Sequence, residues 1–280
     1  MPISILFIQG TLKFSFFVKT KNYSIFVKNL INMKSNFKLI LTLLVSSFVL
    51  FSCSKSSDSP TAEAPVTPTA PTATGDYWPT AVNNRWTYST NGVVQTTPSK
   101  IVSVNVINSL NYYTFNAPVG ATTQTTGSGL TVTVTNRIRK NGGDYYFRYD
   151  TQSFTSGTIS GTQSDIEFII LKDYLNVGQT WNTNVAQTTT YSNSSIPAQT
   201  TNISYAGTII DKIASFSING TPYPNVIKVK ILQTATPTGQ APQVSENFYW
   251  FAKDVGLIKV ENSINGGSPI VSFLTSYTLN

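Results

Sequence analysis

Asn-Gly dipeptides recur along this 280-residue chain, and they limit the ways in which it can fold. Both central residues of a type I′ turn have positive φ, which Asn and Gly adopt more readily than other residues. A type I′ turn joins the two strands of an antiparallel hairpin, so each dipeptide between strand-like segments predicts one hairpin. Four dipeptides lie in such a position: Asn91-Gly92, Asn141-Gly142, Asn219-Gly220 and Asn265-Gly266.

The segments between these turns alternate apolar and polar residues, as expected of strands with one buried face. Residues 129–140 (GLTVTVTNRIRK) place Leu, Val and Ile opposite Thr and Arg, and residues 225–233 (NVIKVKILQ) repeat this pattern. Residues 144–149 (DYYFRY) place Tyr145, Phe147 and Tyr149 on one face. We find no amphipathic helical segment, and parallel strands would need helical crossovers.

The sequence therefore predicts one all-β domain at residues 76–280, with ten or so strands in an antiparallel meander. The meander is expected to form either a sandwich or a strongly curved, partly closed barrel. The polar residues 185–202 (VAQTTTYSNSSIPAQTTN) predict a long exposed loop or a hairpin tip. Trp86 and Trp181 each follow a similar turn-like stretch, which predicts two buried indoles or, alternatively, two duplicated halves.

Residues 33–53 have the layout of an export signal. Lys34 and Lys38 are followed by the uncharged residues 39–51, which are too few to span a bilayer as a stable helix. Residues 50–53 (LFSC) resemble the lipobox of bacterial lipoproteins. The resemblance implies cleavage before Cys53 and lipid attachment to its thiol; an ordinary secretory signal followed by a buried cysteine is the alternative.

Cys53 is the one cysteine of the chain, so no internal disulfide is expected, and acylation accounts for an unpaired exported thiol. Ser54 in place of Asp resembles the sorting pattern of outer-membrane lipoproteins. The expected location is therefore the cell envelope, with a lipid anchor in the outer membrane. The orientation toward the periplasm or the cell surface stays open.

The sequence divides into four parts on this interpretation. Residues 33–52 form the signal peptide, and residues 53–75 form a tether of Ser, Thr, Pro and Ala that lacks the apolar surface to fold. Residues 1–32 are expected to be an extension from a start codon assigned too early or, alternatively, a long n-region.

The net positive charge of the chain lies mostly before Cys53. Six of the 19 basic residues are lysines in that part, so the chain from Cys53 onward has 13 basic and 12 acidic residues. This near-neutral balance argues against a nucleic-acid partner.

Three stretches resemble a set that recurs in envelope lipoproteins of Gram-negative bacteria, notably the Bacteroidota: YWPTAVNNRW (77–86), VGQTW (177–181) and YWFAKDVGLIKVE (249–261). Asp254 stands where that set usually has glycine. Some such proteins are similar to periplasmic lipoprotein carriers, whose curved antiparallel sheet holds acyl chains. The resemblance implies a curved sheet, with a turn at residues 253–256 between two strands.

The side chains needed for catalysis are scarce. The chain has no His, which excludes Ser-His-Asp and Cys-His catalysis, and no phosphate-binding glycine motif. The acidic pairs Asp165/Glu167 and Asp144/Asp150 fit a glycosidase, a calcium site or, as we favour, a solvated strand face. We therefore expect no enzyme activity, no cofactor and no metal site; a carboxylate-based hydrolase is the remaining catalytic alternative.

Aromatic residues that we expect to be exposed, with amides and hydroxyls around them, suit sugar rings. Tyr146, Tyr149 and Trp250 are the candidate ligand-binding residues. The expected function is that of a non-catalytic, membrane-anchored lipoprotein whose β-domain binds a glycan or an envelope protein. The alternative is a carrier whose concave face holds a lipid, and an exclusively apolar concave face would favour it.

Overall fold

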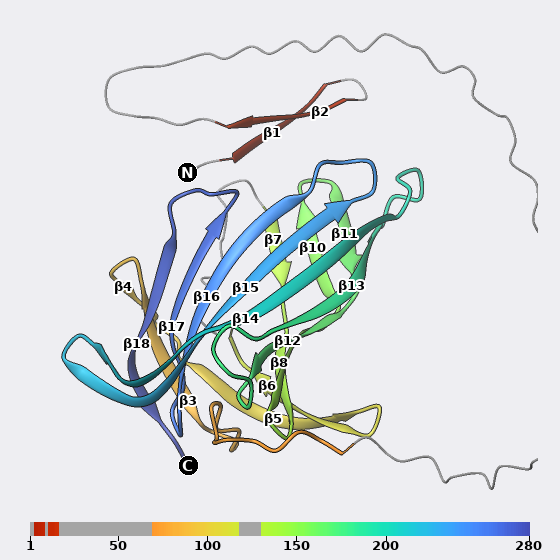
Figure 1. Cartoon of the computed structure of the whole chain (residues 1–280). Coiled ribbons are helices and arrows are strands. Elements are labelled where there is room, and N and C mark those ends of the chain that lie inside the picture. Colours follow the sequence, from red (N-terminus) through yellow and green to blue (C-terminus); the bar gives the residue numbers. More distant parts are fainter. Residues whose placement is uncertain (1–2, 9–10, 17–68, 118–129) are drawn as a thin grey trace, which may run out of the picture.

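The computed structural model describes residues 3–8, 11–16, 69–117 and 130–280 (Figure 1). The predicted signal peptide, Cys53 and most of the predicted tether lie outside these ranges. Within them the chain is all-β, which confirms the predicted fold class. The hairpin of β1 (Ile3–Ile8) and β2 (Thr11–Phe16) forms a separate two-stranded sheet.

The remaining strands form one 16-stranded antiparallel sheet, which has more strands than the ten or so predicted. They are β3 (Arg85–Thr90), β4 (Val93–Val94), β5 (Ser99–Ile107), β6 (Leu110–Phe115), β7 (Leu130–Thr133), β8 (Asn136–Asn141), β9 (Asp144–Tyr149), β10 (Gln152–Ser156), β11 (Ile159–Gln163), β12 (Ile166–Lys172), β13 (Thr180–Tyr191), β14 (Gln199–Ile218), β15 (Thr221–Pro237), β16 (Gln243–Ala252), β17 (Gly256–Ile264) and β18 (Ile270–Thr278).

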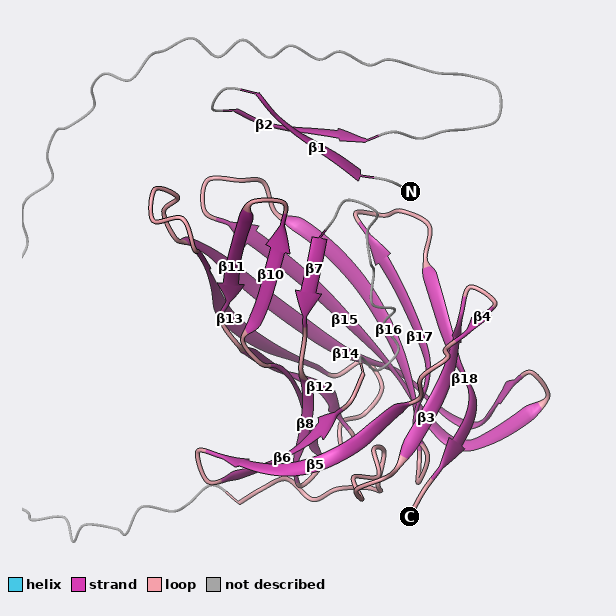
Figure 2. Ribbon diagram, turned by 180° about the vertical axis from the view of Figure 1, so that it is seen from behind, coloured by secondary structure: helices cyan, strands magenta, loops and turns pink. Residues whose placement is uncertain are grey.

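The sheet curves back on itself without closing, as Figures 1 and 2 show. Its ladder runs from β12 through β9, β8, β6, β5, β3 and β18 to β13, and it ends at β11, β10 and β7. At the β12 edge, the Trp181 indole N–H on β13 donates to the Ile169 carbonyl at 2.9 Å. The Phe168 ring on β12 also stacks on Tyr205 of β14, with centroids 4.0 Å apart. These contacts form a seam that covers one edge of the sheet.

The four Asn-Gly dipeptides all lie at hairpins between paired strands. At residues 91–92, 219–220 and 265–266 both residues have positive φ, as predicted. At the β8–β9 hairpin, Asn141 stays in the strand and pairs with Asp144, so the turn residues are Gly142 and Gly143. The predicted single strand at 129–140 is also two strands, β7 and β8, separated by residues 134–135.

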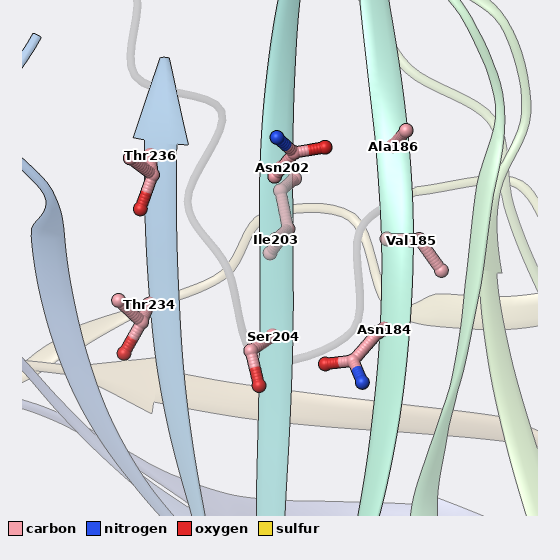
Figure 3. Close-up of a pocket in the computed structure, with 8 residues that line it drawn as sticks. All are labelled: Asn184, Val185, Ala186, Asn202, Ile203, Ser204, Thr234 and Thr236. Carbon is pink, nitrogen blue, oxygen red and sulfur yellow. The ribbon is translucent and has the colours of Figure 1, made fainter. Parts of the chain in front are cut away.

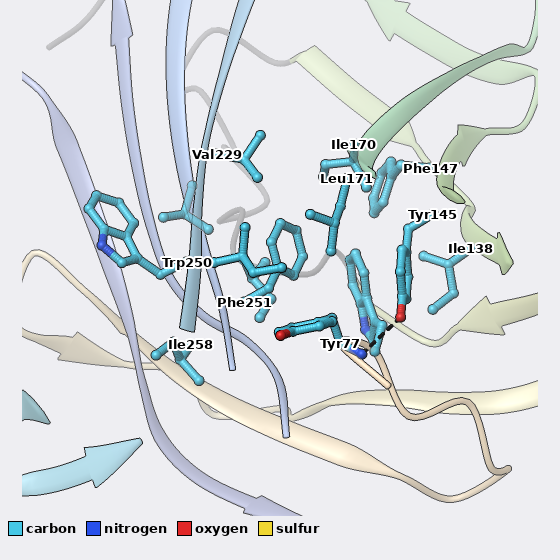
Figure 4. Packing of buried hydrophobic residues seen from close by; sticks show 14 of the residues in the cluster. Tyr77, Ile138, Tyr145, Phe147, Ile170, Leu171, Val229, Trp250, Phe251 and Ile258 are labelled. Carbon is cyan, nitrogen blue, oxygen red and sulfur yellow. Dashed lines mark hydrogen bonds between the residues drawn. The ribbon is translucent and has the colours of Figure 1, made fainter. Parts of the chain in front are cut away.

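The core fills the space between the long strands and the strands from β5 to β12 (Figure 4). Aromatic rings dominate it: Trp78 lies within about 6 Å of Phe115, Phe147 and Phe251. Trp86 is fully buried and Trp181 is 7% exposed, which confirms that both indoles are core residues. The Trp86 N–H donates to the Val255 carbonyl at 2.7 Å, so its polar atom is satisfied.

The segment before β3 closes one end of this core. The Pro71 carbonyl accepts from Gly143 N–H at 2.9 Å, and the Tyr77 N–H donates to the Tyr145 hydroxyl at 2.9 Å (Figure 4). The Asp76 carbonyl accepts from the Asp254 N–H in the turn between β16 and β17. Residues 71–78 therefore connect the β8–β9 hairpin to the β16–β17 turn. Asp254 in that turn has φ of 58°, a conformation that glycine adopts at little cost.

Gly207 on β14 provides a test of the seam. A Cβ atom there would lie 2.1 Å from Cε2 of the Trp181 indole. We expect Gly207→Ala to displace this ring and lower the free energy of unfolding by about 2 kcal/mol or more. Urea denaturation measures the change. Thr208→Ala, on the outer face of the same strand, is the control; equal stability of the two variants would contradict the role of the seam.

Candidate functional site

An open hollow of about 500 Å³ lies on the long strands β13, β14 and β15 (Figure 3). The strand pairing places Asn184, Ser204 and Thr234 side by side. The next row on the same face consists of Ala186, Asn202 and Thr236. Side chains alternate along a strand, and Ile203, between Asn202 and Ser204, is buried in the core. The hollow therefore lies on the outer face of the sheet, opposite the core.

The polar side chains of the hollow are uncharged and free to bind. Within the described part of the chain, none of them has a hydrogen-bond partner in the protein. They are the two amides of Asn184 and Asn202 and the hydroxyls of Ser204, Thr234 and Thr236. Amides and hydroxyls both donate and accept hydrogen bonds, and the methyl groups of Ala186 and the two threonines add small apolar contacts.

Sequence reasoning missed this site because it interpreted residues 185–202 as a loop or hairpin tip. The hairpin tip is confirmed at residues 192–198, but the flanking residues belong to β13 and β14. Small polar residues alternate there with half-buried ones such as Val185, so the apolar periodicity is weak. The register between the strands, which brings Asn184 beside Ser204, was not available from the sequence.

Tyr146, the first candidate residue, lies on the outer face of β9 in a network of ion pairs. The Arg139 guanidinium lies over its ring, with Cζ 3.4 Å from the centroid, and Arg139 also pairs with Glu167 at 2.6 Å. The Tyr146 hydroxyl donates to Asp144, which pairs with Lys172 at 2.9 Å. Burial and Asp144 raise the pKa of Tyr146. One face of the ring is thus already covered by an arginine.

Tyr149, the second candidate, points to the opposite face of the same strand. Its half-buried ring makes an edge-to-face contact with Phe147, with centroids 5.1 Å apart. Its position on the Tyr145 face agrees with the predicted alternation. Burial raises the pKa of Tyr149, and Tyr205 and Tyr249 lie near it on the inner face. Tyr146 and Tyr149 therefore do not form one surface.

Trp250, the third candidate, was expected to be exposed, but it is only 3% exposed. The end of the β14–β15 hairpin bends over the outer face of β16, and Phe216 stacks on the indole at 6.1 Å. Lys259 and Lys228 lie 4.5 Å and 4.8 Å from the ring, which completes its cover. The structure therefore corrects the expectation of an exposed Trp250, and it does not bring Trp250 together with the two tyrosines.

The acidic pairs lie on the outer face of β9 and beside β12, in ion pairs with arginine and lysine. Asp150 pairs with Arg137 at 2.7 Å and with Arg148 at 3.0 Å, and Arg148 also pairs with Asp165. Each carboxylate is partnered by a cation, as in a salt-bridged strand face. Among the described residues, no group of three or more Asp, Glu, His or Cys is placed to hold a metal ion. Nor do the described ranges contain a helix with the length and hydropathy of a membrane span.

The comparisons with known proteins give one weak similarity. No protein-family model and no curated protein matches the chain. Among solved structures, the chain is similar to a protein described as a "putative lipoprotein" from Parabacteroides distasonis. The two are 9% identical, the match covers 73% of this chain and 99% of that one, and the TM-score is 0.39. The similarity assigns neither an activity nor a ligand to this chain.

Asp173, at the end of β12, is a fully buried carboxyl group that holds the segment before β3. Its Oδ2 accepts from the Thr74 N–H at 3.0 Å. Its Oδ1 has no hydrogen-bond partner in the described structure, and the Lys212 ammonium donates to the Asp173 backbone carbonyl instead. Burial raises the pKa of Asp173, because the charged form loses hydration that these contacts do not replace.

This raised pKa predicts a pH dependence of stability. The stabilising contribution of the protonated form is fully present below the unfolded pKa, about 4, and is lost as the pH rises through the folded pKa. Asp173→Asn removes this titration and keeps an oxygen for the Thr74 N–H. We expect the stability of the variant relative to the natural protein to increase from pH 4 to pH 7. Urea denaturation across this range measures it, and parallel pH curves would contradict it.

Proposed function

We propose that this chain is a lipoprotein of the bacterial cell envelope, anchored through Cys53 in the outer membrane, whose β-domain binds a neutral glycan without catalysis. The observation that supports glycan binding is the hollow on β13–β15. It presents five uncharged, unpartnered amides and hydroxyls on one exposed face. A glycan offers hydroxyl and ring oxygens at similar spacing, and it brings no charge that would need a counter-ion.

The inner face of the long strands is less suited to a lipid ligand. Next to the core, that face is filled by side chains such as Ile231 and Tyr249. Farther along, it turns polar, because Gln233 lies beside Tyr205 and Ser245, and Asn247 donates to the Ile231 carbonyl. An acyl chain packed here would leave the Gln233 amide without a hydrogen-bond partner. This mixed lining supports the glycan-binding proposal over the carrier alternative.

The ion pairs on β8, β9 and β12 also support a non-catalytic role. A glycosidase needs two carboxyl groups that face a shared substrate, one of them protonated. Here Asp150, Asp165 and Glu167 each accept from an arginine on the sheet surface. An arginine partner stabilises the ionised form of a carboxyl group and so disfavours a role as general acid.

The anchor is supported by the residues around Cys53 and by the route of the chain. Lys34, Lys38, the uncharged run and Ser52 stand in the order that a lipoprotein signal requires. Residues 69–71 then lead into the domain at one end of the sheet (Figure 1). One acylated cysteine followed by a polar segment would place the domain outside the bilayer.

A substitution in the hollow tests glycan binding. Ser204→Tyr fills the centre of the hollow, and we expect it to weaken glycan binding at least about tenfold, or by about 1.4 kcal/mol. Thr208→Tyr introduces the same ring on the same face of β14 outside the hollow and should bind as the natural protein does. Calorimetry with neutral oligosaccharides and purified envelope polysaccharide measures both. Binding that is unchanged in Ser204→Tyr would exclude this surface.

A second substitution tests the anchor. Cys53→Ala removes the thiol to which a diacylglycerol would be attached, so the protein should no longer incorporate radiolabelled palmitate in a bacterial host. Intact-mass spectrometry should show the natural protein cleaved before Cys53 and carrying acyl chains. A natural protein without lipid would refute the anchor.

A further inference from the structure

The β5–β6 hairpin carries an exposed aliphatic tip. Val102, Val104 and Val106 on β5 are 44%, 45% and 70% exposed, and Leu110 on β6 is 44% exposed. Val104 and Val106 share one face of the hairpin, and Leu110 pairs with Ile107 on the other. Exposed apolar side chains therefore lie on both faces of the hairpin, next to a polar but uncharged turn. Such a concentration within nine residues is typical of a surface that contacts an apolar partner.

The turn at this tip is a tight one without glycine. Asn108 and Ser109 have φ of 51° and 64°, as a two-residue type I′ turn requires. The pairing of β5 with β6, which begins at Ile107 and Leu110, stabilises the left-handed conformation of these two non-glycine residues. The tip is thus a narrow, ordered projection, as Figures 1 and 2 show.

Beyond Lys100 at its base, the hairpin is also free of charge. No Asp, Glu, Lys or Arg occurs between Ile101 and Asn136, whereas the neighbouring strands β8 and β9 carry arginines in ion pairs. Transfer of a charged side chain into a bilayer is costly, and an uncharged aliphatic tip avoids this cost. A polar protein partner would not need this composition.

The chain from the proposed anchor enters beside this hairpin. β6 and β8 are antiparallel, with Tyr113 opposite Ile138, so the β8–β9 turn lies at the same end of the sheet as the β5–β6 tip. Gly143 in that turn donates to the Pro71 carbonyl. Only 15 residues separate Cys53 from Thr69, where the described domain begins. Attachment at this end would place the hairpin, rather than the opposite end of the sheet, nearer to the bilayer that holds the anchor.

We propose that the tip of the β5–β6 hairpin inserts into the surface of the phospholipid bilayer as a second, reversible membrane contact. This inference rests on the proposed lipid anchor at Cys53. The anchor raises the local concentration of the hairpin at the bilayer surface, so that even a weak second contact is populated. The contact would fix the orientation of the domain relative to the bilayer.

A fluorescent label tests the contact. Cys53 is the chain's one cysteine and is blocked once acylated, so Asn111→Cys provides a single thiol beside the tip. The lipidated full chain is labelled with an environment-sensitive fluorophore and placed in vesicles of phosphatidylethanolamine and phosphatidylglycerol. We expect a blue-shifted emission and protection from aqueous iodide. The same label at Ser195→Cys, in the β13–β14 loop, should stay fully quenched by iodide.

Charge substitutions identify the tip as the cause. Val106→Asp should abolish the blue shift of the label at position 111, and the high exposure of Val106 means that the fold should tolerate the change. Val93→Asp, on β4 and 73% exposed, is the matched control and should preserve the shift. Both variants should keep the circular dichroism spectrum of the natural protein.

The outcomes separate the hairpin from the anchor. A mature protein that carries no diacylglycerol on Cys53 would refute the anchor and this inference with it. An acylated protein whose label at position 111 is quenched as strongly as the label at position 195 would refute the hairpin contact and leave the anchor in place. Equal blue shifts of the label at position 111 with and without Val106→Asp would also overturn the proposal.

Discussion

The fold depends on the packing of one sheet edge against the sheet's own inner face. A sheet of 16 strands has two faces and two edges, and the described part of the chain contains no helix to cover them. Stacking of Phe168 on Tyr205, together with the Trp181 hydrogen bond to β12, bends the sheet until its inner face covers itself. Gly207 permits this bend, because any larger residue would collide with the indole.

The same bend separates the molecule into surfaces with different chemistry. The inner face is filled with aromatic rings, and the outer face of β13–β15 keeps small amides and hydroxyls. The outer face of β8, β9 and β12 instead carries paired charges, which satisfy one another. The hollow gathers several polar groups that have no partner in the described structure. A ligand that supplies hydrogen bonds and no charge suits it best.

Local patterns predicted the hairpins well, because turn chemistry acts over two residues. Asn219-Gly220 and Asn265-Gly266 adopt the expected positive φ values, whereas the Asn108-Ser109 turn was missed because neither residue is glycine. Contacts between distant segments were beyond reach. Trp250 alternates like an exposed residue, but Phe216, 34 positions earlier, covers it after the β14–β15 hairpin bends. The hollow was missed for the same reason, because strand register decides which small side chains are neighbours.

Residues 71–78 bind three separate parts of the sheet before the chain reaches β3. Their partners are Gly143 on the β8–β9 hairpin, Asp173 after β12 and Asp254 in the β16–β17 turn. A mechanical load that arrives from the N-terminal side would therefore be divided among these attachments. β3 follows these attachments in the sequence. Its backbone hydrogen bonds to β18 and β5 would therefore not be the first to break. If the domain is held at its N-terminal end, the hydrogen bonds of residues 71–78 would break before tension reaches the rest of the sheet.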